Sequence, residues 1–190
     1  MKEPTTFPKT PWYEVVTGDL LEQGDLIKNC PALELPSEFR FNVTTPNESV
    51  NVVPKLWNVA ILTQSCDLIN KDLSQVLVCP YRSSSNAIEL LPEEQRDSRK
   101  KRDAFLEQVR RGYQHSLHML AACEEDNFLQ DFQILDFRQV FTIPFDLLTY
   151  CAKQNEQRLR LNSPYREHLA QAFARFFMRV GLPIDIPRFR

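Results

Sequence analysis

The amino-acid sequence predicts an α+β fold: a twisted, mostly antiparallel β-barrel or half-barrel, with a helical insertion on its surface and a C-terminal helix packed on the sheet. The supporting patterns are nearly continuous apolar runs at 57–62 and 76–79, an alternating strand pattern at 132–143 and an amphipathic helical pattern at 163–180. With 190 residues, of which 43% are hydrophobic and 25% are charged, the composition is that of an ordinary globular protein. We therefore expect one domain over residues 1–190, with a barrel core at about 12–82 and 113–143.

Residues 1–55 are rich in proline and in short apolar clusters, which predicts irregular β structure. Residues 12–16 form a strand-like cluster, and residues 39–43 alternate apolar and polar side chains as a half-exposed strand does. Pro54 suits the end of a strand because it has no amide hydrogen to donate to a neighbouring strand.

The two apolar runs at 57–62 and 76–79 are the clearest strands, and their continuity predicts that both faces are covered. A polar segment at 63–75 separates them. If the two strands pair as an antiparallel hairpin, Thr63 falls roughly opposite Cys79. The polar residues that follow Thr63 would then line a rim beside residues 79–82.

A surface helix is predicted at about 91–111, because Pro92 suits a first helical turn, Gly112 supplies a stop and the apolar side is narrow. A strand could follow at 113–120. The segment 132–143 predicts a further strand with three large apolar side chains, Leu135, Phe137 and Phe141. Burying each contributes on the order of 1.5–3 kcal/mol, so we expect all three in the core.

The clearest helical pattern in the sequence lies at about 163–180. Ser163 is suited to cap the helix and Pro164 to occupy its first position, while Gly181 supplies a stop. Apolar residues recur at spacings of three and four, which predicts that this helix packs on the sheet.

Charge and targeting features exclude some classes of protein. The formal net charge is −2, so binding of nucleic acid would require a local basic patch. The first residues lack a secretory pattern and no apolar run approaches about 20 residues, so we expect a cytoplasmic protein without a membrane partner. The five cysteines include no C-x-x-C pair, which favours reduced thiols and argues against a standard zinc site. We expect neither a metal nor a cofactor.

The first candidate site is the polar segment after the apolar run at 57–62. Cys66 would be nucleophilic only if a base or a cation lowered the pKa of its thiol, and the neighbouring Asp67 does the opposite. His115 could supply the base if the fold brought it near. Asp67 also suits a turn or a helix cap. The candidate binding residues of this segment are Thr63, Gln64, Ser65 and Asp67.

Histidine spacing argues against a metal site. His115 and His118 are three residues apart, and on a strand such residues point to opposite faces. His168, within the terminal helix, is expected at the surface.

The second candidate is the basic run Arg99, Lys100, Lys101 and Arg102 in the predicted surface helix. These side chains could contact phosphate groups. Acidic residues are interleaved with them, however, and this pattern favours a solvated helix held by ion pairs.

Three short segments carry a family resemblance. They are Gly24-Asp25-Leu26-Ile27, then Asn58 to Thr63, then Val76 to Tyr81. In this order, over about residues 24–84, the chain resembles the PemK/MazF-like small β-barrels, and the resemblance implies an SH3-like barrel.

Members of that family are commonly RNA endonucleases of toxin–antitoxin systems. They use an arginine in the first long loop and a hydroxyl residue after a proline-containing strand. By position, the resemblance implies Arg40 as the arginine and Ser83 or Ser84 as the hydroxyl. Residues 31–39 are apolar and acidic where the family is rich in glycine and arginine, and the chain after Arg82 has no counterpart, so the resemblance supports a barrel more than a nuclease.

Two functions are compatible with these observations. The first is a non-catalytic interaction or regulatory module of a bacterial toxin–antitoxin-like or phage-defence system, which binds RNA, DNA or a protein partner. The alternative is a metal-independent RNA endonuclease in which Arg40 or Arg82 stabilises the phosphorane-like charge. Ser83, or a Cys66–His115 pair, would then transfer protons.

Overall fold

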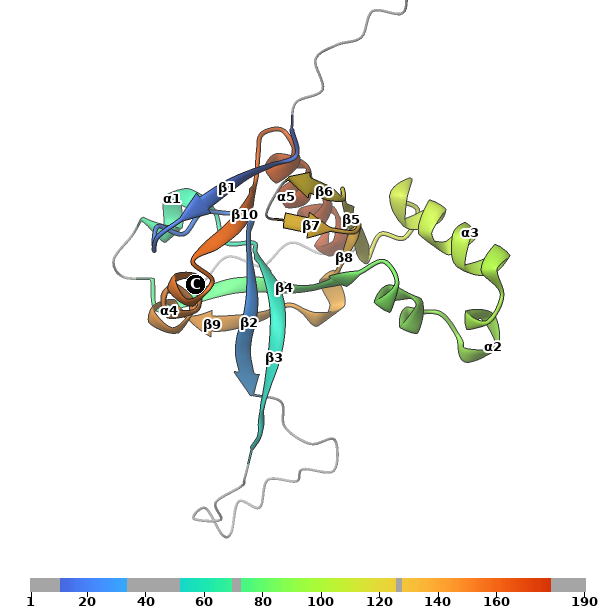
Figure 1. Ribbon diagram of the computed structural model, residues 1–190, viewed down its shortest axis with the longest axis horizontal. Helices are drawn as coiled ribbons and strands as arrows, with labels where there is room; N and C mark the ends of the chain where they lie inside the picture. Colours follow the sequence, from blue (N-terminus) through green and yellow to red (C-terminus); the bar gives the residue numbers. More distant parts are fainter. Residues whose placement is uncertain (1–10, 34–51, 70–72, 126–127, 179–190) are drawn as a thin grey trace, which may run out of the picture.

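An eight-stranded antiparallel sheet organises the protein (Figure 1). The computed structural model describes residues 11–33, 52–69, 73–125 and 128–178. The strand order is β1-β10-β2-β3-β4-β8-β5, and β9 pairs with β4. The strands are β1 Tyr13–Thr17, β2 Asp25–Leu33, β3 Pro54–Ile61, β4 Gln75–Ser83, β5 Leu117–Leu120, β8 Gln133–Asp136, β9 Phe141–Pro144 and β10 Gln157–Leu161. A separate two-stranded sheet contains β6 Cys123–Glu125 and β7 Phe128–Gln130.

Five α-helices and two 3₁₀ helices accompany the strands. They are α1 Ser65–Leu68, η1 Asn86–Leu90, α2 Glu93–Arg96, α3 Arg99–Arg110, η2 Phe137–Gln139, α4 Phe145–Gln154 and α5 Tyr165–Phe177. Helices α2 and α3 lie to one side of the sheet, as the predicted surface insertion requires (Figure 1). No helix in the described part of the chain is long and apolar enough to cross a membrane.

The α+β class and the antiparallel sheet are confirmed, but the sheet is not closed into a barrel. Within the described residues, its end strands β1 and β5 do not pair with each other. They are nevertheless near neighbours, because the hydroxyl of Tyr13 in β1 donates a hydrogen bond of 2.7 Å to the carbonyl of Ala121, directly after β5. Burial raises the pKa of the Tyr13 hydroxyl, so this group remains a donor at ordinary pH.

Strand β4 is the centre of the sheet. One edge pairs with β3, and the other edge pairs first with β9 and then with β8. The strand predicted at 132–143 therefore lies along β4, but the prediction of one continuous strand is wrong. The 3₁₀ helix η2 interrupts it, where the Asp136 carboxylate accepts a hydrogen bond of 3.1 Å from the backbone N–H of Arg138.

Three apolar clusters stabilise this arrangement. The first joins α5 to the sheet, with Leu169 fully buried and the rings of Phe137 and Phe173 5.5 Å apart. The second joins α4 to β2, β3 and β4 around Leu148, and the third joins α3 to β5 and β8. The prediction that the terminal helix packs on the sheet is confirmed.

Some local predictions differ from the structure. Ser163 does not cap the terminal helix, since the residue before its first turn is Pro164 and no side chain caps it. The strand predicted at 39–43 lies outside the described residues. Helix α4 and strand β10 were not predicted, although β10 lies between β1 and β2 in the sheet.

Candidate functional site

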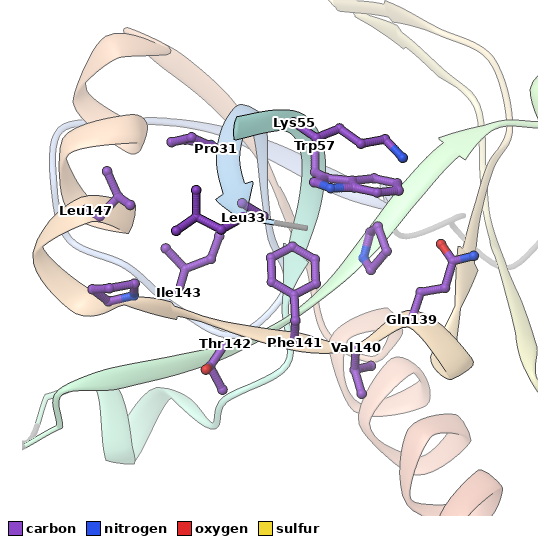
Figure 2. A pocket seen from close by; sticks show the side chains of 13 residues that line it. Pro31, Leu33, Lys55, Trp57, Gln139, Val140, Phe141, Thr142, Ile143 and Leu147 are labelled. Atoms are coloured by element: carbon purple, nitrogen blue, oxygen red, sulfur yellow. The ribbon is translucent and has the colours of Figure 1, made fainter. Parts of the chain in front are cut away.

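An apolar groove of about 800 Å³ opens beside the sheet (Figure 2). It lies between the β2–β3 hairpin on one side and β9 with the start of α4 on the other. Its lining residues are Pro31, Ala32, Leu33, Lys55, Trp57, Pro80, Gln139, Val140, Phe141, Thr142, Ile143, Pro144 and Leu147. We call this hollow the apolar groove.

The two-residue period of the strands places the apolar side chains in the groove. Side chains two apart on a strand point to the same face, so Lys55 and Trp57 of β3 lie on one wall. Phe141 and Ile143 of β9 lie on the opposite wall, and Figure 2 shows both pointing into the groove while Thr142 points away from it.

A cation–π contact forms the aromatic wall. The ammonium of Lys55 lies 4.0 Å from the centroid of the Trp57 ring, and among the described residues that line the groove Lys55 alone is charged. Such a contact contributes about 0.5–1 kcal/mol at an exposed site and holds the indole ring in place. The groove therefore presents an oriented aromatic surface with little charge.

A β-bulge sets the direction of the hairpin that bears this wall. The β2–β3 register shifts between Ile27 and Cys30, and Asn29 has a φ of 57°. Two side chains satisfy the backbone there: Asn155 accepts from the Lys28 N–H at 2.9 Å, and Asn58 accepts from the Asn29 N–H at 3.1 Å. Beyond the bulge, the side chains of Leu33 and Leu56 are 73% and 62% exposed.

The predicted polar segment lies elsewhere, at the junction between β3 and β4. The hydroxyl of Thr63 accepts a hydrogen bond of 2.8 Å from the N–H of Leu77, and the hydroxyl of Ser65 accepts one of 3.1 Å from the N–H of Gln23. Thr63 therefore lies beside Leu77 and not opposite Cys79, whose partner is Ala60. The prediction that residues 64–67 form a rim beside 79–82 is wrong, because the register places those two segments toward opposite ends of β4.

Cys66 lies on the surface in the short helix α1. Its Sγ is 3.6 Å from Oε1 of Gln64 and 3.7 Å from Oδ1 of Asp67, and both of these atoms are acceptors. Neither contact supplies the base or cation that would activate a thiol. Asp67 lies in the first turn of α1 and does not cap a helix, because Gln64 occupies the N-cap position and no side chain caps α1.

His115 lines a different hollow, together with His118 and His168. The argument that His115 and His118 must face apart does not hold, because His115 precedes β5 and does not follow strand geometry. Within the described residues, no group of three or more histidine, cysteine, aspartate or glutamate side chains is arranged to hold a metal ion.

Arg82 and Ser83 end strand β4 and make contacts that hold them in place. Arg82 donates a hydrogen bond of 2.9 Å to Oε1 of Gln139, which lines the apolar groove, and lies 3.9 Å from Glu89. The hydroxyls of Ser83 and Ser85 are 2.8 Å apart. Ser84 donates to Asp131 at 2.8 Å. Arg40, the other candidate arginine, lies outside the described residues.

The basic run lies along α3, on the side arm of the molecule (Figure 1). Arg99, Lys100 and Lys101 are exposed, and Arg102 is half-buried. Arg99 is 3.8 Å from Asp103, one turn later, with both side chains largely exposed. An exposed pair of this kind contributes at most about 1 kcal/mol, so the run retains the character of a solvated surface.

The most buried charged residues were not predicted from the sequence. Asp25, Arg158 and Arg160 form a cluster in which the Asp25 carboxylate accepts from Arg158 at 2.8 Å and from Arg160 at 2.5 Å. The guanidinium groups also donate to the carbonyls of Gly18 and Leu20. This charge cluster therefore holds the β1–β2 connection against β10. The alternating residues 158–161 are the signal that could have revealed the strand.

Comparisons with known proteins assign no family to this chain. No family model matches the chain, and no curated protein matches it in sequence. The resemblance to PemK/MazF-like barrels thus remains a prediction.

Proposed function

We propose that this protein is a non-catalytic interaction module that binds an apolar segment of a protein partner in the apolar groove. The observation that carries the proposal is the aromatic and proline-lined hollow beside the Trp57 ring. Grooves of this composition recognise extended peptides through a few anchored side chains. The exposed Leu33 and Leu56 continue this apolar surface along the hairpin.

The unpaired edge of β9 supports an extended ligand. Among the described residues, β9 pairs only with β4, and its own residues line the groove. An extended peptide can add to such an edge by backbone hydrogen bonds while its side chains enter the neighbouring pockets. The groove therefore offers both a backbone partner and apolar anchor positions.

Charge favours a protein segment over nucleic acid at this surface. Single-stranded nucleic acid is bound by aromatic residues within a strongly positive groove. Here the lining contributes one cation, Lys55, and that cation already lies over the Trp57 ring. The biological setting that we propose, a bacterial toxin–antitoxin-like or phage-defence system, depends on the family resemblance of residues 24–84.

The fluorescence of Trp57 tests the proposal. The chain has two tryptophans, and Trp12 stacks on Tyr165 at 3.8 Å, so a Trp12→Phe variant keeps an aromatic contact and leaves Trp57 as the sole reporter. Peptides would be selected from a displayed random library on the wild-type protein and then titrated. We expect saturable changes in Trp57 emission that are insensitive to salt.

Titration calorimetry compares two matched variants, because one of them lacks the Trp57 reporter: Trp57→Ala, which removes the aromatic wall, and Leu20→Ala, which removes an exposed apolar side chain outside the groove. Trp57→Ala should cost on the order of 2 kcal/mol or more in binding free energy, as expected for a buried aromatic anchor. Leu20→Ala should bind like the wild type. Equal binding by all three proteins would contradict the proposal. Saturation by a single-stranded RNA with steep salt dependence would instead identify nucleic acid as the ligand.

A second candidate function is a metal-independent RNA endonuclease. The observation favouring it is that Arg82 and Ser83 are adjacent at the end of β4, with Arg82 bonded to Gln139 of the groove. Incubation of the purified protein with RNA in EDTA tests this function. Arg82→Ala should abolish cleavage, and Arg99→Ala, on the surface of α3, should leave it unchanged. If the wild type leaves RNA intact under these conditions, the nuclease is excluded.

A further inference from the structure

A second hollow, of about 310 Å³, brings together all three histidines of the chain. It lies where the end of α3 and the nearby strand β5 meet helix α5, which comes much later in the sequence. Its lining residues are Val109, Arg110, Arg111, Gly112, Gln114, His115, Leu117, His118, Met119, His168, Gln171, Ala172 and Arg175. We call it the histidine pocket.

The lining of the histidine pocket is basic. Among the described residues it includes three arginines and no aspartate or glutamate. One carboxylate outside the lining, that of Glu107, offsets part of this charge by pairing with Arg110 at 2.6 Å and with Arg111 at 2.5 Å. Arg175, on the opposite helix, has no ion pair among the described residues. The pocket therefore carries excess positive charge.

His118 contributes a buried polar atom without a partner. Its Nε2 is inaccessible and makes no hydrogen bond within the described part of the chain. Burial, with a smaller contribution from the nearby His168, lowers the pKa of His118 to about 4. The ring is thus neutral at pH 7 and packs against Phe137, with centroids 6.2 Å apart. A buried polar group left unpaired costs about 1–3 kcal/mol, which a ligand that bonds to it would recover.

We propose that the histidine pocket binds a terminal phosphate group. Arginine guanidinium groups recognise phosphate through paired hydrogen bonds, and here they come from two helices on either side of the hollow. The side-chain amides of Gln114 and Gln171 add donors suited to phosphate oxygens, and a small shift of the lining would expose the unpaired Nε2 of His118 as a further partner. The phosphate belongs either to a free mononucleotide or to the 5′ end of an oligonucleotide.

This site is independent of the proposed function. Its lining shares no residue with the apolar groove, and its ligand chemistry is opposite, anionic rather than apolar. The basic run of α3 begins on the same helix that ends at Arg110, so a longer phosphate-bearing chain would meet further cations there.

The test uses histidine ring signals of the full chain in two-dimensional proton–nitrogen NMR spectra. The probes are inorganic phosphate, adenosine 5′-monophosphate, adenosine, and one short single-stranded oligonucleotide with either a 5′-phosphate or a 5′-hydroxyl. We expect saturable shifts of the His118 ring with phosphate-bearing probes and none with adenosine. Saturation by the mononucleotide identifies a small-molecule source, and saturation by the 5′-phosphorylated oligonucleotide alone identifies a strand end.

Arg175→Gln should weaken binding by about tenfold or more, the loss expected for a charge-assisted hydrogen bond, while Lys153→Gln, at an exposed cation on α4 outside the histidine pocket, should not. His118→Phe removes Nε2 and keeps an aromatic ring beside Phe137. If that variant fails to fold, Arg175→Gln alone decides the outcome. The proposal is overturned by unsaturated shifts with every phosphate probe, by equal binding of the 5′-hydroxyl oligonucleotide, or by wild-type affinity in Arg175→Gln.

Discussion

Asp25 is the residue on which the buried charge cluster depends. Its carboxylate is fully buried between Arg158 and Arg160, whose side chains are themselves almost inaccessible. Removing one member of such a group leaves the others buried without compensation, and that costs more than the intact group contributes.

We expect Asp25→Ala to lower the free energy of unfolding by about 3–5 kcal/mol, because two guanidinium groups would lose their carboxylate. The control is Asp19→Ala, which removes an exposed partner of Lys153 at 3.0 Å and should leave the free energy of unfolding nearly unchanged. Chemical denaturation measures both. A cost for Asp25→Ala no larger than that for Asp19→Ala would show that the cluster is well hydrated.

His118 should make stability depend on pH. In the folded protein its pKa is about 4, against an ordinary value of 6.5, because burial disfavours the charged ring. Between these values the unfolded chain binds a proton that the folded chain does not, so stability falls as the pH falls from 6.5 to 4. Below about 4 both states are protonated and this loss is complete.

We expect His118→Phe to reduce the stability loss between pH 7 and pH 4 by up to about 3 kcal/mol relative to the wild type. Urea unfolding at several pH values provides the measurement. Parallel profiles for wild type and His118→Phe would place the pKa of His118 near its ordinary value.

Cysteine reactivity follows burial at single residues. Cys66 is exposed, whereas Cys30, Cys79, Cys123 and Cys151 are buried, and burial raises the pKa of the thiols of Cys30 and Cys79. A native sample should therefore show one rapidly reacting thiol per chain with a maleimide reagent. Cys66→Ser should remove that reaction, and two fast thiols in the wild type would indicate opening of a core cluster.

At the scale of elements, β10 shows why part of the fold was not predicted. Residues 158–161 alternate arginine and leucine, a pattern typical of a strand with one exposed face. Both arginines are instead buried, because each reaches Asp25, more than 130 positions earlier in the chain. Local pattern carries no information about such a partner. The segment 132–143 shows the opposite error, because its continuous strand pattern predicts one strand where the structure has two, β8 and β9, separated by η2.

The packing of β2 against β10 makes a prediction at Gly24. Gly24 and Gly18 both have positive φ values, of 86° and 79°. A Cβ atom added at Gly24 would lie 3.0 Å from Cβ of Leu161, whereas a Cβ atom added at Gly18 would have no other atom within 4 Å. Gly18→Ala should thus cost only backbone strain, about 1–2 kcal/mol. Gly24→Ala should cost clearly more. Equal melting temperatures for the two variants would show that β10 moves away without penalty.

At the scale of the whole molecule, a side-chain hydrogen bond links the two end strands of the open sheet. Tyr13→Phe removes the bond to Ala121 and leaves the buried ring in place. We expect a loss of about 1 kcal/mol and faster amide exchange in β1 and β5. Tyr150→Phe, at an exposed position on α4, is the control. Unchanged exchange in Tyr13→Phe would show that the ring, not its hydroxyl, joins the two ends.

Sequence patterns predicted the class of fold better than the candidate site. The core strands, the surface helices and the packed terminal helix follow from local periodicity and were anticipated. The apolar groove could not be anticipated, because Trp57 and Phe141 meet across strands that pair with β4 on opposite edges. Trp57 was assigned to a buried strand, a role that its neighbour Val59 does fill. Which apolar side chains remain uncovered is decided by how the sheet bends.

The β-bulge at Asn29 influences the width of the apolar groove from a position outside its lining. One wall of the groove stands on the hairpin beyond the bulge, while the other wall stands on β9. The angle between them is determined where Asn58 and Asn155 hold the bulged backbone, outside the lining itself. Substitutions at those asparagines would therefore change the width of the apolar groove while every residue that lines it stays the same.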